Sequence, residues 1–196
     1  MTEALEQQVV DGRRLRSERS KLAIVEAALD LIDEGELVPT AQRVAERAGV
    51  GIRSFFRHFE DMEALFVAVD AHARESYEGV FLGGDRDGSL EERIDHFVRR
   101  HGDAYDNVWN MVLSTQAQLW RSPVLRKNYA RSQRGLRKDL DDWLPELQTL
   151  KADQREAVDA IASFEMWHRL RAHQNLSKKA SIEIIASLIK GLISPS

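Results

Sequence analysis

Four residues with hydrogen-bonding side chains alternate with three phenylalanines in the segment from residue 51 to residue 59. The polar residues are Arg53, Ser54, Arg57 and His58. The rings belong to Phe55, Phe56 and Phe59. We expect a helix that packs its rings on a core and still offers donors to phosphates and to the edges of bases. This spacing therefore favours recognition of DNA over catalysis.

A second short helix is predicted directly before this segment. The hydroxyl of Thr40 can accept a backbone N–H of a first helical turn, and Val44 and Ala48 begin an apolar stripe. Gly49 can take the positive φ that ends a helix. Residues 40–66 therefore predict a helix-turn-helix.

The segment from about residue 19 to residue 66 resembles the DNA-binding domain of the TetR (tetracycline repressor) family of bacterial transcription regulators. The resemblance is carried by residues 24–32 with Gly35, by Thr40, Val44, Ala45 and Ala48 to Val50, by residues 56–59, and by residues 63–66. It implies an all-α protein that binds an operator as a homodimer and carries a small-molecule pocket in its C-terminal part.

Three positions depart from the pattern of that family. Phe56 stands where the family usually has tyrosine, Gly51 where it often has a capping serine or threonine, and Met62 where a phosphate-contacting lysine is common. Each departure removes one polar contact. The fold prediction is unaffected, because Phe56 keeps the ring and loses only the hydroxyl.

We predict a set of DNA-binding residues that comprises the two short helices and a basic arm at residues 1–16. The set is Arg13, Arg14, Arg16, Thr40, Gln42, Arg43, Arg53, Ser54, Phe56, Arg57 and His58. A flexible arm can place guanidinium groups on phosphates or in a narrow minor groove. The alternative for the arm is a disordered solubilising tail.

Composition agrees with a regulator of this kind. The net charge is −4 over 196 residues, but residues 13–59 hold nine basic and seven acidic side chains, a local balance of +2. The chain has no cysteine, which excludes disulfides and thiolate zinc sites. No signal peptide or long apolar run is present, so we expect a cytoplasmic protein without a membrane partner. We also expect no cofactor, no metal and no enzymatic activity, because phosphate-loop and nucleophile-elbow motifs are absent.

After residue 66 the pattern is helix after helix. Helices are predicted over 61–81, from 89 to a break or kink at Gly102, over 106–121, from 123 to just before Pro145, over 153–174 and over 177–192. With the first three, this makes about nine helices. We assign residues 17–62 to the DNA-binding domain and residues 63–196 to a C-terminal ligand-binding and dimerisation bundle.

The last helix is apolar on more than one side. Ile184 and Leu188 lie on a different face from Ile182, Ile185 and Ile189, so a second subunit is expected to cover the extra face. The predicted dimer interface is Ile161, Ile184, Ile185, Leu188, Ile189 and Leu192. The alternative is a central helix that is buried within its own subunit.

Aromatic residues gather in the C-terminal part, which holds all four tryptophans. Rings and a few polar groups between helices are typical of a pocket for an apolar or aromatic small molecule. The predicted ligand-binding residues are Phe97, His101, Tyr105, Trp109, Trp120, Phe164, Trp167 and His168. Packed core is the alternative for each ring.

The chain contains two further motifs that can carry chemistry, a Glu-x-x-His pair and a basic run. Glu165 and His168 form one Glu-x-x-His pair, whereas a di-iron bundle needs two such pairs. The basic residues from Arg126 to Lys138 can hold an anionic ligand or simply form a solvated face. The sequence as a whole predicts a homodimeric DNA-binding repressor that is released by a small ligand. The alternative is a helical ligand-binding or interaction module with weakened or absent DNA binding.

Overall fold

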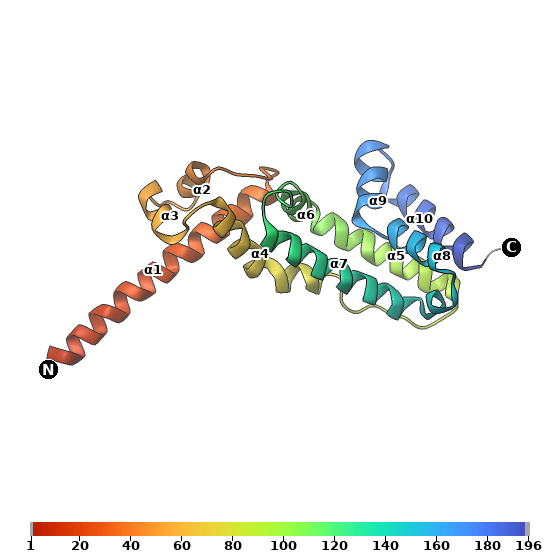
Figure 1. The fold of residues 1–196 in the computed structure, drawn as a ribbon, viewed down its shortest axis with the longest axis horizontal. Coiled ribbons are helices and arrows are strands. Elements are labelled where there is room, and N and C mark those ends of the chain that lie inside the picture. The colour runs from red at the N-terminus through yellow and green to blue at the C-terminus, as the bar shows by residue number, and fades with distance from the viewer. Residues whose placement is uncertain (1, 195–196) are drawn as a thin grey trace. The chain divides into compact units, whose positions relative to one another are not determined.

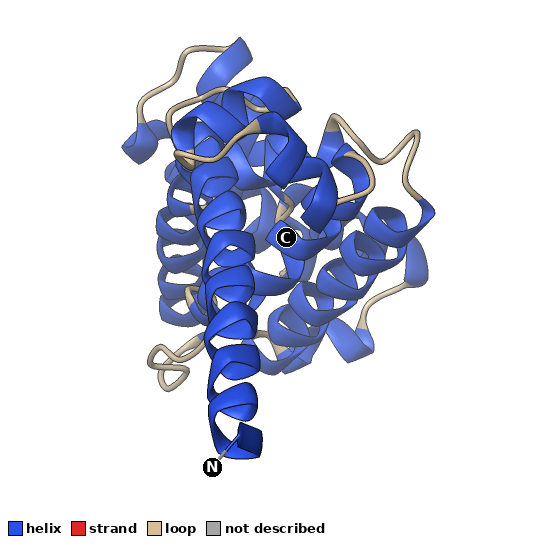
Figure 2. Cartoon of the chain, turned by 90° about the vertical axis from the view of Figure 1, so that its left-hand side faces the viewer, coloured by secondary structure: helices blue, strands red, loops and turns tan. Residues whose placement is uncertain are grey.

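The computed structural model describes residues 2–194, and side chains from residue 14 onward. Within that range every regular element is a helix (Figure 2). The all-α prediction is confirmed. No helix in the described range is both long enough and apolar enough to cross a membrane.

Within residues 2–194, ten α-helices follow one another (Figure 1). They are α1 Thr2–Asp33, α2 Ala41–Arg47, α3 Ile52–His58, α4 Met62–Gly79, α5 Leu90–Asn107, α6 Trp109–Gln116, α7 Pro123–Trp143, α8 Ala152–Ile161, α9 Phe164–His168 and α10 Lys178–Ile193. A 3₁₀ turn, η1 (Pro145–Thr149), follows α7, and a π-helical turn, η2 (Arg169–His173), follows α9.

The helices form two compact units. The first unit contains Met1–Glu75 and Asn110–Lys127, and the second contains Ser76–Trp109 and Asn128–Ser196. The two predicted domains divide the chain once, at residue 63. In the structure the first unit also contains residues 110–127, which return to it from the second unit. Leu125 is buried in the core of the first unit, and Met111 and Leu119 pack against that core. These contacts join residues that are far apart in sequence, so the hydrophobic periodicity near residue 63 does not predict them.

The core of the first unit joins α1, α2 and α3, which lie beside one another (Figure 1). Ile24, Val44, Phe55 and Leu65 are each completely buried in it. The helix signals predicted from the sequence are present. The Thr40 hydroxyl accepts the backbone N–H of Arg43 at 3.3 Å, and Gly49 has a φ of +66° after α2.

The N-terminal segment differs from the prediction of a flexible arm, because α1 begins at Thr2. Residues 2–16 contain no proline and are rich in helix-forming Leu, Glu, Gln and Arg. Further along, the Nε of Arg14 donates to Glu18 at 3.0 Å, an i,i+4 pair that supports the helix.

In the second unit α10 packs against α5 and α8. The Ser89–Glu92 capping box predicted at the start of α5 is present, but α5 does not break at Gly102. A Cβ at Gly102 would lie 2.6 Å from the ring of Trp167. The glycine therefore permits a close approach of that ring and does not end the helix.

The predicted helix over 153–174 is divided at residues 162–163. The hydroxyl of Ser163 accepts the backbone N–H of Met166 at 3.2 Å and begins α9 as a new helix. The predicted end of α7 before Pro145 is confirmed.

Candidate DNA-binding surface and ligand cavity

The helix α3 presents three of the predicted DNA-binding residues to solvent. Arg53, Phe56 and Arg57 are exposed, and the exposed fraction of Phe56 is 53%. The rings of Phe55 and Phe59 are buried beneath them, so Phe56 is not one of the core rings. This face offers two guanidinium groups and one ring to a partner in solution.

Ser54 and His58 lie at the edge of that face. The Ser54 hydroxyl accepts a hydrogen bond from Arg57 at 2.8 Å, which holds this guanidinium against α3. His58 is half-buried, and its Nε2 is buried without a hydrogen-bond partner. Burial and the neighbouring charges of Arg57 and Lys21 lower the pKa of His58, so the imidazole is neutral at neutral pH. The Nε2 of His58 therefore does not face solvent, whereas the side chain of Arg53 is exposed.

On α2 the predicted contacts are exposed but already hydrogen-bonded. The Gln42 amide donates to Glu46 at 2.8 Å, and the Arg43 guanidinium donates to Glu36 at 3.3 Å. Arg47, which was not predicted to bind DNA, donates to both carboxylate oxygens of Glu34 at 2.9 and 2.5 Å. This hydrogen-bonded pair raises the pKa of Arg47 and lowers the pKa of Glu34.

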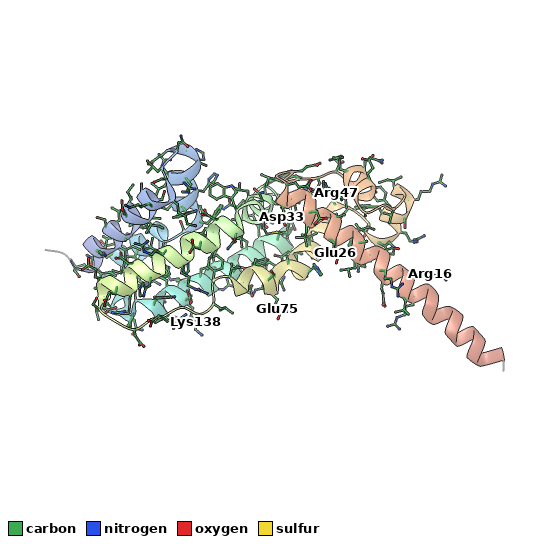
Figure 3. All side chains as sticks on the ribbon, turned by 180° about the vertical axis from the view of Figure 1, so that it is seen from behind. Arg16, Glu26, Asp33, Arg47, Glu75 and Lys138 are labelled. Atoms are coloured by element: carbon green, nitrogen blue, oxygen red, sulfur yellow. The ribbon has the colours of Figure 1, made fainter. Side chains whose placement is uncertain are left out.

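The basic residues of the predicted arm lie on α1. Arg14 and Arg16 are exposed, and Figure 3 labels Arg16 on α1 and Arg47 on α2. The side chain of Arg13 lies outside the described residues. Because the segment is helical, any guanidinium contact to DNA would come from a helix face.

The second unit contains a cavity of about 560 Å³. Its lining comes from α5, α7, α8, α9 and the turns that flank α9. The residues are Phe97, His101 and Tyr105; Gln133, Leu136 and Leu140; Glu156, Asp159 and Ala160; and Ala162, Ser163, Glu165, Met166 and Arg169. The volume suits a small organic molecule.

Residues 24–69 match the family model described as "Bacterial regulatory proteins, tetR family". This helix-turn-helix segment is therefore of the TetR family. Solved structures also share its fold. The regulator SCO7518 of Streptomyces coelicolor A3(2), whose role is itself a proposal, is 22% identical (TM-score 0.59; 87% of this chain and 98% of that chain). A transcriptional regulator from Rhodococcus sp. Rha1 is 15% identical (TM-score 0.65; 90% and 95%).

The multidrug binding protein EbrR, in complex with imidazole, is 20% identical (TM-score 0.62; 86% of this chain and 94% of that chain). No protein with a curated description matches the sequence. The segment 24–69 matches TetR-family regulators in sequence, and the chain as a whole shares the fold of these solved structures.

Three of the eight predicted ligand residues line the cavity, namely Phe97, His101 and Tyr105. The other five predictions differ from the structure, for reasons of packing. Phe164 and Trp167 are buried in the core, with exposed fractions of 2% and 1%.

Trp109 and His168 pack on Phe164 instead, with ring centroids 5.5 and 5.8 Å from it. Trp120 is 79% exposed and belongs to the first unit. These positions could not be assigned from aromatic content, because an aromatic side chain packs equally well in a core, a cluster or a pocket wall.

The polar lining of the cavity has no signal in the sequence pattern. Glu156, Asp159 and Glu165 contribute carboxylates, and Arg169 contributes a guanidinium. Helical periodicity gives no signal for them, because a charged residue on a helix is far more often solvated than part of a cavity wall.

The predicted dimer residues fall into two groups. Ile185 and Ile189 are 4% and 0% exposed, so they lie in the core of their own chain. The structure does not place these two residues on a surface that a second chain could contact. Leu188 is 42% exposed. Ile161, Ile184 and Leu192 are half-buried. The two faces predicted for the last helix are therefore present, one in the core and one outside it.

The two other motifs can also be located. Residues 14–194 contain no group of three or more His, Asp or Glu side chains placed to hold a metal ion. In the basic run, Arg126 donates to the carbonyl of Leu119 at 2.5 Å, and Arg131 donates to Glu78 at 3.3 Å. Both guanidinium groups therefore have partners within the chain.

Proposed function

We propose that this protein is a cytoplasmic homodimeric repressor whose affinity for a pseudo-palindromic operator is lowered by a small molecule bound in the second unit. Residues 17–62 form the DNA-binding domain of this proposal, and residues 63–196 carry ligand binding and dimerisation. The observation that carries it is the exposure of Arg53 and Arg57 on α3, above the buried ring of Phe55.

Two copies of α3 are needed for an operator of that symmetry. They must enter major grooves about 34–36 Å apart, which is one turn of DNA. Leu188 and the half-buried Ile184 on α10 support pairing of two subunits, because together they form an apolar face that a second copy of the helix can cover. Ile161, Ile184 and Leu192 supply the half-buried margin of the same interface.

The cavity in the second unit supports the ligand response. EbrR, which shares the fold, is described as a multidrug binding protein, and we extend the binding of small organic molecules to this chain. A ligand needs to lower DNA affinity by only about 5- to 150-fold, a coupling of about 1–3 kcal/mol.

The proposal is tested by fluorescence anisotropy with labelled DNA from the region that flanks the protein's own gene. We expect saturable binding that weakens steeply with salt, since several phosphates are neutralised per dimer. A random duplex of equal length is the control. Equal affinity for both duplexes, or no dependence on salt, would contradict the proposal.

The second candidate is a helical ligand-binding module with weak or absent DNA binding. Three features favour this candidate, because each removes a polar contact to DNA. Phe56 has no hydroxyl, Met62 stands in place of a basic residue, and the Nε2 of His58 is buried. The same titration separates the two candidates, because this module would not distinguish the flanking DNA from the random duplex.

A further inference from the structure

Three side chains that can carry a positive charge gather at the C-terminal end of α3. Arg57 and His58 are the last two residues of that helix. Lys21 reaches the same place from α1, because its Nζ lies over the ring of Phe59, 5.6 Å from the ring centroid. Phe59 directly follows α3 and is only 3% exposed. A cation–π contact therefore holds the ammonium group beside the end of α3.

No carboxylate within the described residues neutralises these charges. Among residues 14–194, Lys21 forms no ion pair, and Arg57 donates only to the neutral hydroxyl of Ser54, at 2.8 Å. Burial and the charges of Arg57 and Lys21 lower the pKa of His58, and no acidic residue acts in the opposite direction. The positive potential at this end of α3 is therefore uncompensated, which makes it a favourable place for an anion.

The two permanent cations of this group are accessible from solvent. Lys21 and Arg57 are exposed, and so is Arg53, which lies about one turn earlier on α3. The Nε2 of His58 is buried, so this nitrogen offers no contact to an anion in solution. The accessible part of the group is therefore one ammonium from α1 and one guanidinium from α3.

The turn between α3 and α4 supplies no cation of its own. Met62 is the first residue of α4, and the two residues before it, Glu60 and Asp61, are acidic. Asp61 accepts the backbone N–H of Ala64 at 2.8 Å, so its carboxylate belongs to the start of α4. Lys21 therefore provides from α1 a positive charge that the residues directly after α3 lack.

We propose that Lys21 and Arg57 together bind one phosphate of the DNA backbone in each half-site. This inference rests on the proposed function, and it adds Lys21, a residue of α1, to the DNA-binding residues of α3. A phosphate contact fixes the position of α3 on the duplex and reads no base. The contribution of Lys21 is therefore the same for any DNA sequence.

The test measures how the affinity for DNA depends on salt. Lys21→Gln removes the charge and retains a long polar side chain. By fluorescence anisotropy from about 50 to about 200 mM salt, the slope of log affinity against log salt should become shallower by about 1 for each half-site. In about 0.1 M salt the affinity should fall about 5- to 10-fold for each half-site, equally for the flanking DNA and for the random duplex. Lys21→Arg retains the charge and should retain the slope.

Lys138→Gln is the matched control. Lys138 is an exposed lysine of the second unit, and Figure 3 labels it on α7. This variant changes the net charge by the same amount and should leave the slope unchanged. An unchanged slope in Lys21→Gln, or an equal change in both variants, would overturn the inference. A loss confined to the flanking DNA would also overturn it, because it would mean that Lys21 reads bases.

A titration of His58 by NMR tests the position of Lys21 without DNA. Because the charge of Lys21 lowers the pKa of His58, Lys21→Gln should raise that pKa and Lys138→Gln should not. No change in Lys21→Gln would place the ammonium away from α3 and contradict the inference. If Lys21 served only to pack on Phe59, Lys21→Gln would lower the urea midpoint and leave the salt slope as it is in the wild type.

The two proposals fail in different proteins. If the wild-type chain binds the flanking DNA and the random duplex equally, or without dependence on salt, the proposed function is wrong. If the wild type binds as expected and Lys21→Gln retains its affinity and slope, only the assignment of Lys21 is wrong.

Discussion

The two units of the chain build their candidate sites in opposite ways. In the first unit Arg53, Phe56 and Arg57, the candidate DNA-binding side chains of α3, are neighbours in sequence and are exposed. In the second unit the cavity is assembled from residues as far apart as Phe97 and Arg169, and His101 in its wall is only 3% exposed. An exposed binding surface can therefore be formed by residues of a single helix, whereas a cavity requires several helices to pack together.

One ion pair from each unit illustrates how exposed and buried pairs differ. Arg47 and Glu34 form an exposed pair in the first unit, with side-chain exposures of 32% and 60%. In the second unit Arg93 is only 12% exposed and donates to both Glu146 and the backbone carbonyl of Trp143. Exposed pairs contribute little to stability, while removing one partner of a buried pair leaves an uncompensated charge.

The largest effect is expected at the exposed face of α3. Arg53→Ala should weaken operator binding by about 10- to 100-fold per half-site, because it removes a donor that points to solvent in the free protein. Fluorescence anisotropy at fixed salt measures the loss. Arg47→Ala is the matched control, since Arg47 lies on α2 and is bonded to Glu34. If the two variants lose affinity equally, α3 is not the main contact surface.

The next effect concerns the exposed face of α10. Leu188→Glu places a charge in the proposed subunit interface and should weaken dimerisation by about 10-fold or more. Sedimentation equilibrium measures the change. Leu82→Glu is the control, because Leu82 is 67% exposed but lies outside the predicted interface. A dimer that tolerates Leu188→Glu as well as Leu82→Glu would place the interface elsewhere.

Packing in the second unit is tested by a pair of helical glycines. Gly102→Ala should destabilise the protein by about 1–3 kcal/mol, because the new Cβ would meet the Trp167 ring at 2.6 Å. Gly135→Ala, in α7, should instead stabilise it by up to about 1 kcal/mol, since no atom lies within 4 Å of the added carbon. Urea denaturation measures both. Two variants of equal stability would rule out the proposed role of Gly102.

A smaller effect is expected from protonation of buried histidines. Burial lowers the pKa of His101 below its ordinary value of 6.5, so the unfolded chain takes up a proton more readily than the folded protein. Stability should therefore fall as pH drops below about 6.5, by at most about 1.4 kcal/mol per pH unit for this group.

The pKa values of His58 and His168 are shifted in the same direction and add to this slope. Carboxylates with lowered pKa, such as Glu146, lose their contribution only below their ordinary value of 4.5, so the two ranges separate. Urea midpoints between pH 7.5 and 5 measure the slope, and His101→Phe should flatten it. An unchanged slope in that variant would mean that His101 is protonated equally in the folded and unfolded states.

Local features were predicted well because short-range physics decides them. The cap at Thr40, the positive φ of Gly49 and the capping box at Ser89 depend on residues within one helical turn. The end of α7 before Pro145 has the same local cause. Gly102 was misjudged because the reason for that glycine is Trp167, which lies on α9.

The sequence by itself determined that this chain is helical, that α2 and α3 form a helix-turn-helix and that Arg53 and Arg57 point outward. Those outcomes depend on helical periodicity, capping and side-chain polarity, which act between neighbours. Only the tertiary structure decided that Phe97, His101 and Tyr105 line a cavity while Trp167 is core. It also decided that Nε2 of His101 lies 2.9 Å from Oδ2 of Asp139, because that distance depends on how α5 packs against α7. A ring or an imidazole has the same sequence signature in either environment, and only the packing of distant helices assigns it to one.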